Sequence, residues 1–154
     1  MKPAPLQLTD YFITELHLKA NLAFDSDCTE QLEVTLDTLH ISNSITKRDQ
    51  EEDTSKGTMW NIGMKITQEI KEGETNIPYE FSLELQGIVF AFPQIPEDRL
   101  ETVVSANAPA MLFGAAREII RAATGRGPFP AVIIPSTNFL SNCDDDSNRS
   151  ETTD

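Results

Sequence analysis

The stretch that decides the fold is YEFSLELQ, residues 79–86, in which apolar and polar side chains alternate without exception. Tyr79, Phe81, Leu83 and Leu85 fall on one side, and each residue between them is polar. A period of two residues is typical of a β-strand with one face buried and one face in solvent. We therefore predict a strand here.

The same alternation occurs in three earlier segments. Residues 60–67 alternate and are followed by turn residues around Gly73, which predicts a hairpin with the strand above. Residues 16–25 and 31–41 also alternate, with a change of phase near Thr38 that we interpret as a β-bulge. Together these segments predict an antiparallel sheet of four strands in two hairpins, apolar on one face and polar, mostly acidic, on the other.

The segment between the two predicted hairpins is polar and dense in charge. Residues 47–53 read KRDQEED and cannot bury an apolar face. We predict that residues 42–57 form a flexible loop.

Helical spacing replaces alternation after Pro96, which is followed by two acidic residues as at many helix starts. Asn107 and Pro109 then indicate that one helix ends and a longer one begins. The longer helix is expected to run to Thr124, with Gly125 as a left-handed stop. Strands followed by helices that pack on their apolar face define an α+β fold.

Length and charge exclude several classes of protein. A chain of 154 residues favours one domain, which we expect at residues 1–140, with 141–154 as an acidic, disordered tail. Lys and Arg number 12 against 25 Asp and Glu, a net charge of -13, which disfavours nucleic acid as a partner. No apolar run is long enough for a membrane span and no secretory signal is evident, so we expect a cytoplasmic protein.

The longer predicted helix carries more apolar surface than one sheet needs. Residues 108–116 contain no polar side chain, which indicates a second burial partner. Small residues would allow two such helices to approach closely, so we predict a symmetric homo-oligomer. Its predicted interface is Leu112, Gly114, Ala115, Ala116 and Ile119. The alternative is that residues 129–140 fold back and cover the helix within one chain.

No pattern of a catalytic or metal site is evident. Cys28 and Cys143 have no zinc-ligand spacing, the two histidines belong to no triad, and residues 125–127 are too short for a phosphate-binding loop. We expect no enzyme activity, metal or cofactor. The remaining chemistry is that of a binding protein, with an apolar client-binding set at Phe90, Phe92, Met111, Leu112 and Phe113. A small α+β ligand-binding or enzyme domain stays open as an alternative.

The ordered motifs between residues 105 and 139 resemble those of the bacterial export chaperone family SecB. They are Pro109, Leu112-Phe113, Ala116-Arg117, Arg126-Gly127, Phe129-Pro130 and Asn138-Phe139. Residues 22–25 and 85–90 resemble the family more loosely. The sequence departs from it at Ala108, Gly114 and Pro135, and after Phe139, where the family's further amphipathic helix is lost or truncated.

The resemblance implies an ATP-independent chaperone, a dimer of dimers that holds unfolded precursor proteins and delivers them to the SecA motor. An acidic surface for SecA would comprise Asp25, Glu80, Ser82 and Glu84, although Asn21 stands where an acid is expected. Some SecB-like chains instead protect an aggregation-prone antitoxin of a toxin-antitoxin system, which is an alternative for this divergent sequence.

Overall fold

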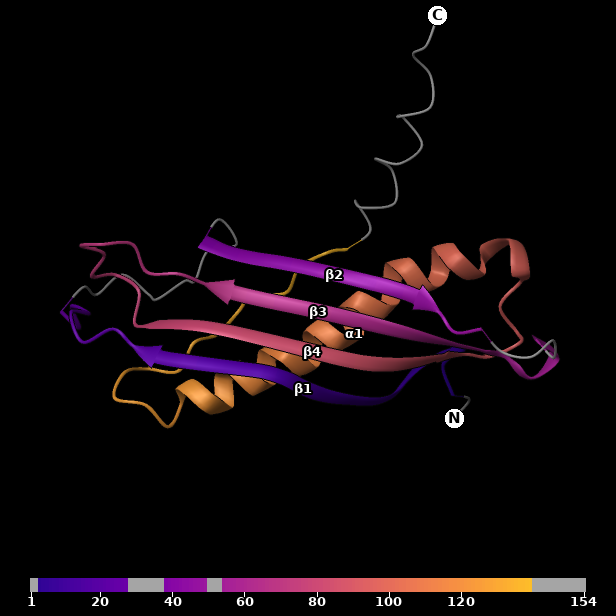
Figure 1. The fold of residues 1–154 in the computed structure, drawn as a ribbon, viewed down its shortest axis with the longest axis horizontal. Coiled ribbons are helices and arrows are strands. Elements are labelled where there is room, and N and C mark those ends of the chain that lie inside the picture. The colour runs from indigo at the N-terminus through magenta and orange to yellow at the C-terminus, as the bar shows by residue number, and fades with distance from the viewer. Residues whose placement is uncertain (1–2, 28–37, 50–53, 140–154) are drawn as a thin grey trace, which may run out of the picture.

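The chain forms one sheet crossed by one long helix, as seen in a computed structural model that describes residues 3–27, 38–49 and 54–139. The elements are β1 (Leu6–Ala20), β2 (Leu39–Lys47), a short 3-10 helix (Thr54–Lys56), β3 (Thr58–Gln68), β4 (Tyr79–Ala91) and α1 (Glu97–Thr124). The strand order is β1-β4-β3-β2, with antiparallel neighbours throughout. Figure 1 shows α1 running diagonally behind the sheet. The predicted α+β fold is confirmed.

The alternation predicted for the two central strands is confirmed. In β4 every second side chain from Tyr79 to Ala91 is buried, and in β3 the even-numbered residues from Trp60 to Gln68 are buried. These side chains point toward α1 and form the core with it. We call this side of the sheet its helix face and the other its open face.

β1 differs from its prediction at both ends, since it begins at Leu6 rather than Leu16 and ends at Ala20. Leu22 and Phe24, which were predicted to continue the strand, lie in the turn that follows it. The Phe24 ring instead packs edge-on against Phe129, with centroids 5.0 Å apart.

Two β-bulges explain why the first half of β1 was missed. The register with β4 shifts between Leu8 and Asp10 and between Ile13 and Glu15, so that Thr9 and Thr14 are extra residues. Each bulge moves the following side chains to the opposite face. The apolar side chains on the helix face are therefore residues 6, 8, 11, 13, 16, 18 and 20, a spacing that strict alternation does not reveal.

The predicted hairpin between the first two strands is wrong. β1 pairs with β4, from Leu6 opposite Ala91 to Ala20 opposite Tyr79, while β2 pairs with β3 at the other edge. β1 and β4 have 15 and 13 residues, whereas β2 has 9. The long strands together satisfy more backbone groups than a pairing of β1 with β2 could. Residues 31–37 of the predicted second strand lie outside the described residues.

The loop predicted for residues 42–57 is wrong at its start, because residues 42–47 continue β2. Their partners in β3 place Ser42, Ser44 and Thr46 on the open face, while Leu39, Ile41 and Ile45 of the same strand give the helix face its apolar contacts. An edge strand with one face in solvent needs few apolar residues, so its pattern resembled that of a loop.

One continuous helix replaces the two predicted ones. Pro109 lies inside α1 and is buried, so its packing outweighs the hydrogen bond that a proline removes. Asn107 does not cap a new helix, because its side-chain amide donates to the Val103 carbonyl oxygen of the same helix at 2.7 Å. Gly125 has φ of -65°, which is right-handed, so the predicted left-handed stop is also wrong.

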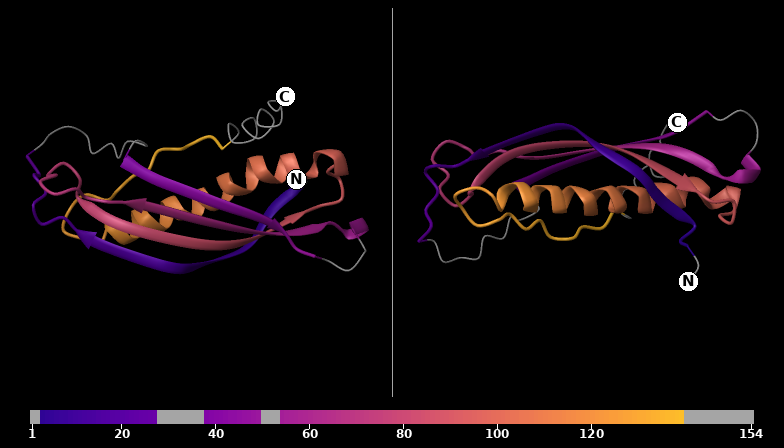
Figure 2. Two further views of the ribbon diagram at one scale, coloured as in Figure 1. Left: turned by 45° about the horizontal axis from the view of Figure 1, so that its top comes forward. Right: turned by 90° about the horizontal axis from the view of Figure 1, so that it is seen from below.

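The residues after α1 turn back along it. Residues 129–139, which we call the strap, are neither helix nor strand and lie on the same side of the sheet as α1 (Figure 2). Val132, Ile134 and Phe139 are buried members of the core. The C-terminal segment thus folds back on the helix within its own chain over the described residues, although Ala110 and Gly114 of the apolar run stay exposed.

Candidate functional site

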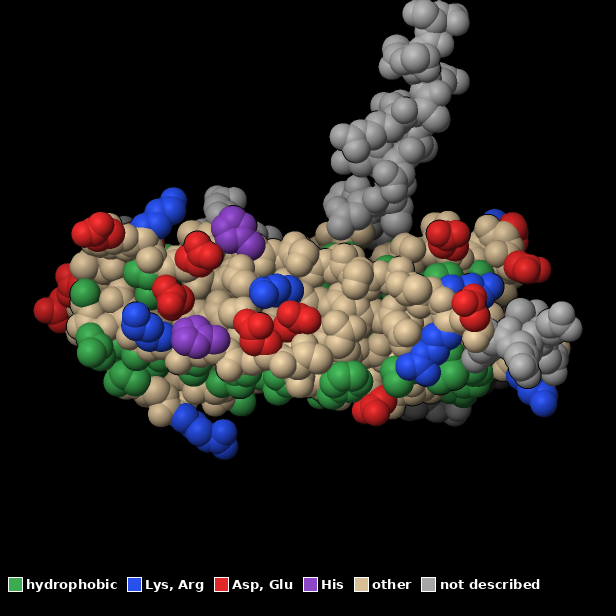
Figure 3. Space-filling model, in the orientation of Figure 1, with side chains coloured by type: hydrophobic (Ala, Val, Ile, Leu, Met, Phe, Trp, Pro, Cys, Tyr) green, Lys and Arg blue, Asp and Glu red, His purple; other side chains and the backbone are tan. Residues whose placement is uncertain are grey.

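An apolar strip is exposed along the β1 edge of the sheet. Tyr11, Ile13 and Leu16 lie on the helix face yet are 45%, 46% and 46% exposed, and Phe12 on the open face is 53% exposed. We call these four residues the β1 strip. Figure 3 shows a row of hydrophobic side chains along this edge. Contiguous apolar surface on an edge strand is typical of a protein-binding site.

The diagonal course of α1 explains why the β1 strip is exposed. α1 packs on β1, β4 and β3 but crosses β1 near only one end of that strand (Figure 1). The strap begins beside the end of β1, where Phe129 packs on Phe24, and runs across the helix face toward β2. The middle of β1, from Tyr11 to Leu16, is therefore left exposed, whereas Leu6 at the start of the strand is buried in the core.

The predicted oligomer interface on α1 is divided between two faces of the helix. Leu112 and Ala116 point into the core of their own chain and are fully buried. Gly114 is exposed, while Ala115 and Ile119 are half-buried. Only these last three predicted residues offer surface to a second molecule.

The predicted client-binding residues are also divided. Leu112 and Phe113 are buried beneath α1, where Phe113 packs against the Phe139 ring with centroids 5.5 Å apart. Met111 is half-buried on the opposite flank of the helix.

Phe90 and Phe92 meet edge-to-face, with ring centroids 4.8 Å apart, at the far end of β4. Phe92 lines a cavity of about 290 Å³ between the start of α1 and the ends of β2 and β3. The structure thus brings Phe90 and Phe92 together but separates them in the fold from the α1 residues.

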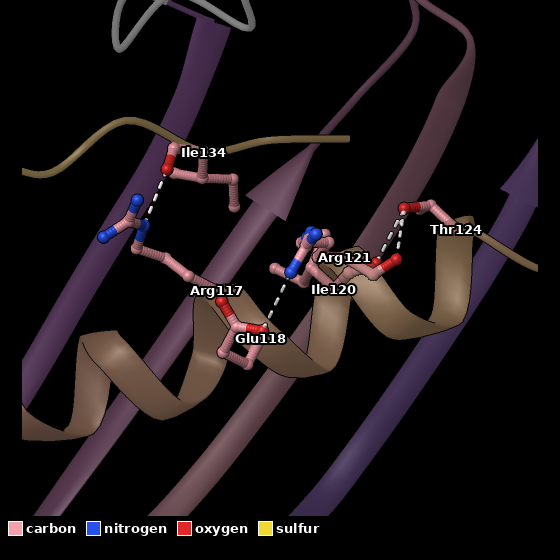
Figure 4. A network of polar contacts seen from close by, with 6 residues as sticks. All are labelled: Arg117, Glu118, Ile120, Arg121, Thr124 and Ile134. Carbon is pink, nitrogen blue, oxygen red and sulfur yellow. Dashed lines mark hydrogen bonds and ion pairs between the residues drawn. The ribbon is translucent and has the colours of Figure 1, made fainter. Parts of the chain in front are cut away.

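The strap is attached to α1 by a cluster of polar contacts (Figure 4). Arg117 donates from Nε to the Ile134 carbonyl oxygen at 2.6 Å and from Nη1 to the Ser136 hydroxyl at 3.1 Å. The Thr124 hydroxyl accepts the Val132 amide at 2.9 Å and donates to the Ile120 carbonyl oxygen at 2.7 Å. Arg121, one turn from Arg117, instead pairs with Glu118 on the surface.

The predicted acidic positions occupy two places. Glu80, Ser82 and Glu84 lie in a row on the open face of β4, whereas Asp25 lies in the turn beyond β1, where its amide donates to the Thr75 carbonyl oxygen at 2.9 Å. The Ser82 hydroxyl donates to the Glu15 carboxylate at 2.9 Å.

The charged strand residues of the open face are mostly acidic, as predicted, with four acids, Asp10, Glu15, Glu80 and Glu84, and two lysines. Lys19 stands opposite Glu80, and Lys65 pairs with Glu84 at 4.0 Å. Both signs are visible on this face in Figure 3.

Asn21 has a structural role that an acid could not take. Its side-chain amide donates to the carbonyl oxygens of Glu74 at 3.0 Å and Ile77 at 2.9 Å. A carboxylate has no hydrogen to donate to these acceptors. The amide therefore ties the end of β1 to the loop before β4.

Sequence reasoning missed Tyr11, Phe12 and Ile13, and assigned no role to Arg117. The signal for Tyr11 and Ile13 was present in the apolar spacing of residues 6, 8, 11, 13, 16, 18 and 20, but this spacing is recognised only if two bulges are allowed, and Phe12 falls outside it. Across residues 3–27, 38–49 and 54–139, no three metal-ligating side chains cluster, and no helix is long and apolar enough to cross a membrane.

Known proteins are similar to this chain in sequence. The family described as preprotein translocase subunit SecB matches residues 13–145. The protein-export protein SecB of Rhodopseudomonas palustris is 33% identical over 69 residues, 45% of this chain and 42% of that protein. The same protein of Saccharophagus degradans is 32% identical over 82 residues, 53% of this chain and 48% of that protein. The chain spans about half the length of these relatives.

Solved structures are similar in fold. A Streptococcus agalactiae protein of unknown function has a TM-score of 0.52 at 13% identity, over 84% of this chain and 96% of that one. A SecB-like chaperone of Mycobacterium tuberculosis, solved with an antitoxin peptide, has a TM-score of 0.48 at 14% identity, over 87% of this chain and 91% of that one. Because the family match runs from β1 through the strap, the chain belongs to the SecB family as a divergent member.

Proposed function

We propose that this protein is an ATP-independent holdase that binds unfolded polypeptides through exposed apolar surface. The observation that carries the proposal is the β1 strip, which leaves four large apolar side chains about half exposed in a chain of the SecB family. An unfolded client exposes apolar side chains of its own. Their burial yields about 25 cal/mol per Å² and requires no fixed sequence.

Two further surfaces support this proposal. The Phe90–Phe92 pair and the adjoining cavity offer aromatic contacts, and Met111 offers a flexible side chain on α1. We assign client contact to these three residues of the predicted set. Leu112 and Phe113 are buried in the core, so they would contact a client only if α1 moved away from the sheet.

The same chain is proposed to self-associate, as a dimer of dimers. Gly114, Ala115 and Ile119 form a strip of small and aliphatic residues on α1 where a second helix can approach closely. The open edge of β1 also favours association, because its outward backbone groups can pair with another strand. Assembly and client binding would then share the apolar surface of β1.

The finer role that we propose is delivery of unfolded precursors to SecA in the cytoplasm. Glu80 and Glu84 are the acidic positions that share one face, and complementary charge on a partner would mainly raise the association rate. Titration calorimetry with SecA tests this role. Binding that weakens in Glu80→Gln and Glu84→Gln but not in Glu118→Gln supports it, and an absence of heat with every variant contradicts it.

The experiment for the holdase itself is size-exclusion chromatography with light scattering. The protein is run alone, with a reduced and alkylated lysozyme that cannot fold, and with native lysozyme. Co-elution with the unfolded form only is the expected result. Failure to bind the unfolded form, or equal binding of both forms, would refute the holdase. If only an antitoxin encoded beside the gene binds, the dedicated-antitoxin alternative replaces precursor delivery.

A further inference from the structure

The cavity at the start of α1 has a polar lining that the binding of unfolded polypeptides does not explain. It measures about 290 Å³ and lies where the first turns of α1 meet the ends of β2 and β3 (Figure 1). A volume at the lower end of the range for small-molecule sites suits one small ligand rather than a length of polypeptide. Its lining includes Lys47, Thr58, Phe92, Ile95, Glu97 and Leu100.

Two opposite charges line this cavity. Lys47 is the last residue of β2 and lies on the helix face, with its Nζ atom 6.0 Å from the centre of the Trp60 ring. Glu97 is the first residue of α1. Within the described part of the chain, neither side chain forms an ion pair. Both charges therefore remain available to a ligand.

A buried hydroxyl adds a hydrogen-bond donor. Thr58 is 5% exposed, and its hydroxyl oxygen accepts the Trp60 Nε1 hydrogen at 3.0 Å. Because this contact uses the oxygen as an acceptor, the hydroxyl hydrogen is left to donate. The cavity thus combines donors for an anionic group, a carboxylate for a cationic group, and apolar side chains for the rest of a ligand.

We infer that this cavity binds a free apolar α-amino acid, such as phenylalanine or leucine. The ligand carboxylate accepts hydrogen bonds from Lys47 and Thr58, and its ammonium group pairs with Glu97. The ligand side chain packs against the apolar lining. An internal residue of a polypeptide carries neither charge, so this site differs in its ligand from a client site. The inference goes beyond the proposed holdase, because a client can bind the β1 strip while the cavity is filled.

The test follows one indole signal of the full chain by heteronuclear NMR. Trp60 is the single tryptophan of the chain, and its Nε1 hydrogen is held by Thr58 at the cavity. Titration with L-phenylalanine should shift this signal, with a dissociation constant of about 1 mM. Three analogues lack one or both charges: 3-phenylpropionate lacks the ammonium group, phenethylamine lacks the carboxylate, and N-acetylphenylalaninamide lacks both. Each should bind about tenfold more weakly, or worse.

Variants assign each charge to its partner. Lys47→Gln and Glu97→Gln should each weaken phenylalanine binding about tenfold. Lys71→Gln and Glu101→Gln are the matched controls, because neither residue lines the cavity, and they should leave binding unchanged. Glu97→Gln should also bind phenylalanine no better than 3-phenylpropionate, because the ammonium group has lost its partner. A general loss of structure would weaken both ligands together and would not remove this preference.

Two results would overturn the inference. One is an indole signal that phenylalanine does not move. The other is equal binding of phenylalanine and N-acetylphenylalaninamide, which would leave the cavity as an apolar contact for polypeptides only. Neither result affects the holdase, which the unfolded lysozyme tests separately.

Discussion

The Tyr79 hydroxyl lies 2.9 Å from the amide nitrogen of Phe129 and accepts its hydrogen bond. The same oxygen lies 3.1 Å from the Thr124 carbonyl oxygen, to which its hydrogen can be donated. One buried side chain on the first residue of β4 thus joins the end of α1 to the start of the strap. The two rings also meet edge-on, with centroids 5.9 Å apart.

Replacement of this hydroxyl is expected to destabilise the fold. Tyr79→Phe leaves the Phe129 amide without the oxygen that accepts its hydrogen bond, which should cost about 1–3 kcal/mol. Thermal unfolding should show a lower Tm for this variant. Tyr11→Phe is the control, because Tyr11 is the other tyrosine and its side chain is half exposed. Equal Tm values for the two variants would contradict the proposed anchor.

Gly57 is expected to resist substitution. Its φ is +110°, and an added Cβ would lie 2.5 Å from the Phe90 ring and 2.6 Å from the Ala91 carbonyl oxygen. Gly57→Ala should therefore cost about 1–3 kcal/mol and disturb the Phe90–Phe92 pair.

Gly114→Ala is the opposite case, because that helical glycine has open space around its Cβ position. It should raise the free energy of unfolding by about 0.5–1 kcal/mol, as measured by urea denaturation. If Gly114→Ala lowered the free energy of unfolding, or if Gly57→Ala left it unchanged, the space around the added Cβ would not be what determines the effect of these substitutions.

Leu112 and Met111 should differ in what their loss affects. Leu112 is fully buried against the sheet near Gly87, so Leu112→Ala should cost about 2–5 kcal/mol of folding free energy. Met111→Ala should cost much less stability but weaken binding of the unfolded lysozyme, because Met111 is half-buried at the surface. Urea denaturation and fluorescence titration of both variants separate the two roles. If Leu112→Ala kept its stability but lost client binding, Leu112 would contact the client, and its assignment to the core would be contradicted.

The β1 strip is expected to control assembly. Ile13→Lys places a charge in the strip, so a self-associating protein should shift toward the monomer in light scattering. Ile133→Lys makes the same change at another exposed isoleucine, on the outer side of the strap, and should leave the mass unchanged. An unaltered mass for Ile13→Lys, beside an oligomeric parent protein, would exclude the strip from the interface.

Alternation alone determined the central sheet and the class of fold. β3 and β4 have no bulge against each other, so a period of two residues survives in their sequence and predicts which side chains are buried. The ordered motifs from Pro109 to Phe139 likewise indicated the family. The alternation is a local pattern, and the motifs are recognised by their order and spacing along the chain. Neither requires knowledge of a tertiary contact.

Only the tertiary structure decided which strands pair, where β1 begins and which apolar residues stay exposed. Thr9 and Thr14 donate across the ladder to the carbonyl oxygens of Ile88 and Glu84, at 3.0 and 3.2 Å, and the bulges they form conceal the alternation of β1. Pro109 stays inside α1 because the core buries it. The exposure of the β1 strip depends on the angle at which α1 crosses the sheet. That angle results from the packing of all the elements together, and no single stretch of sequence contains it.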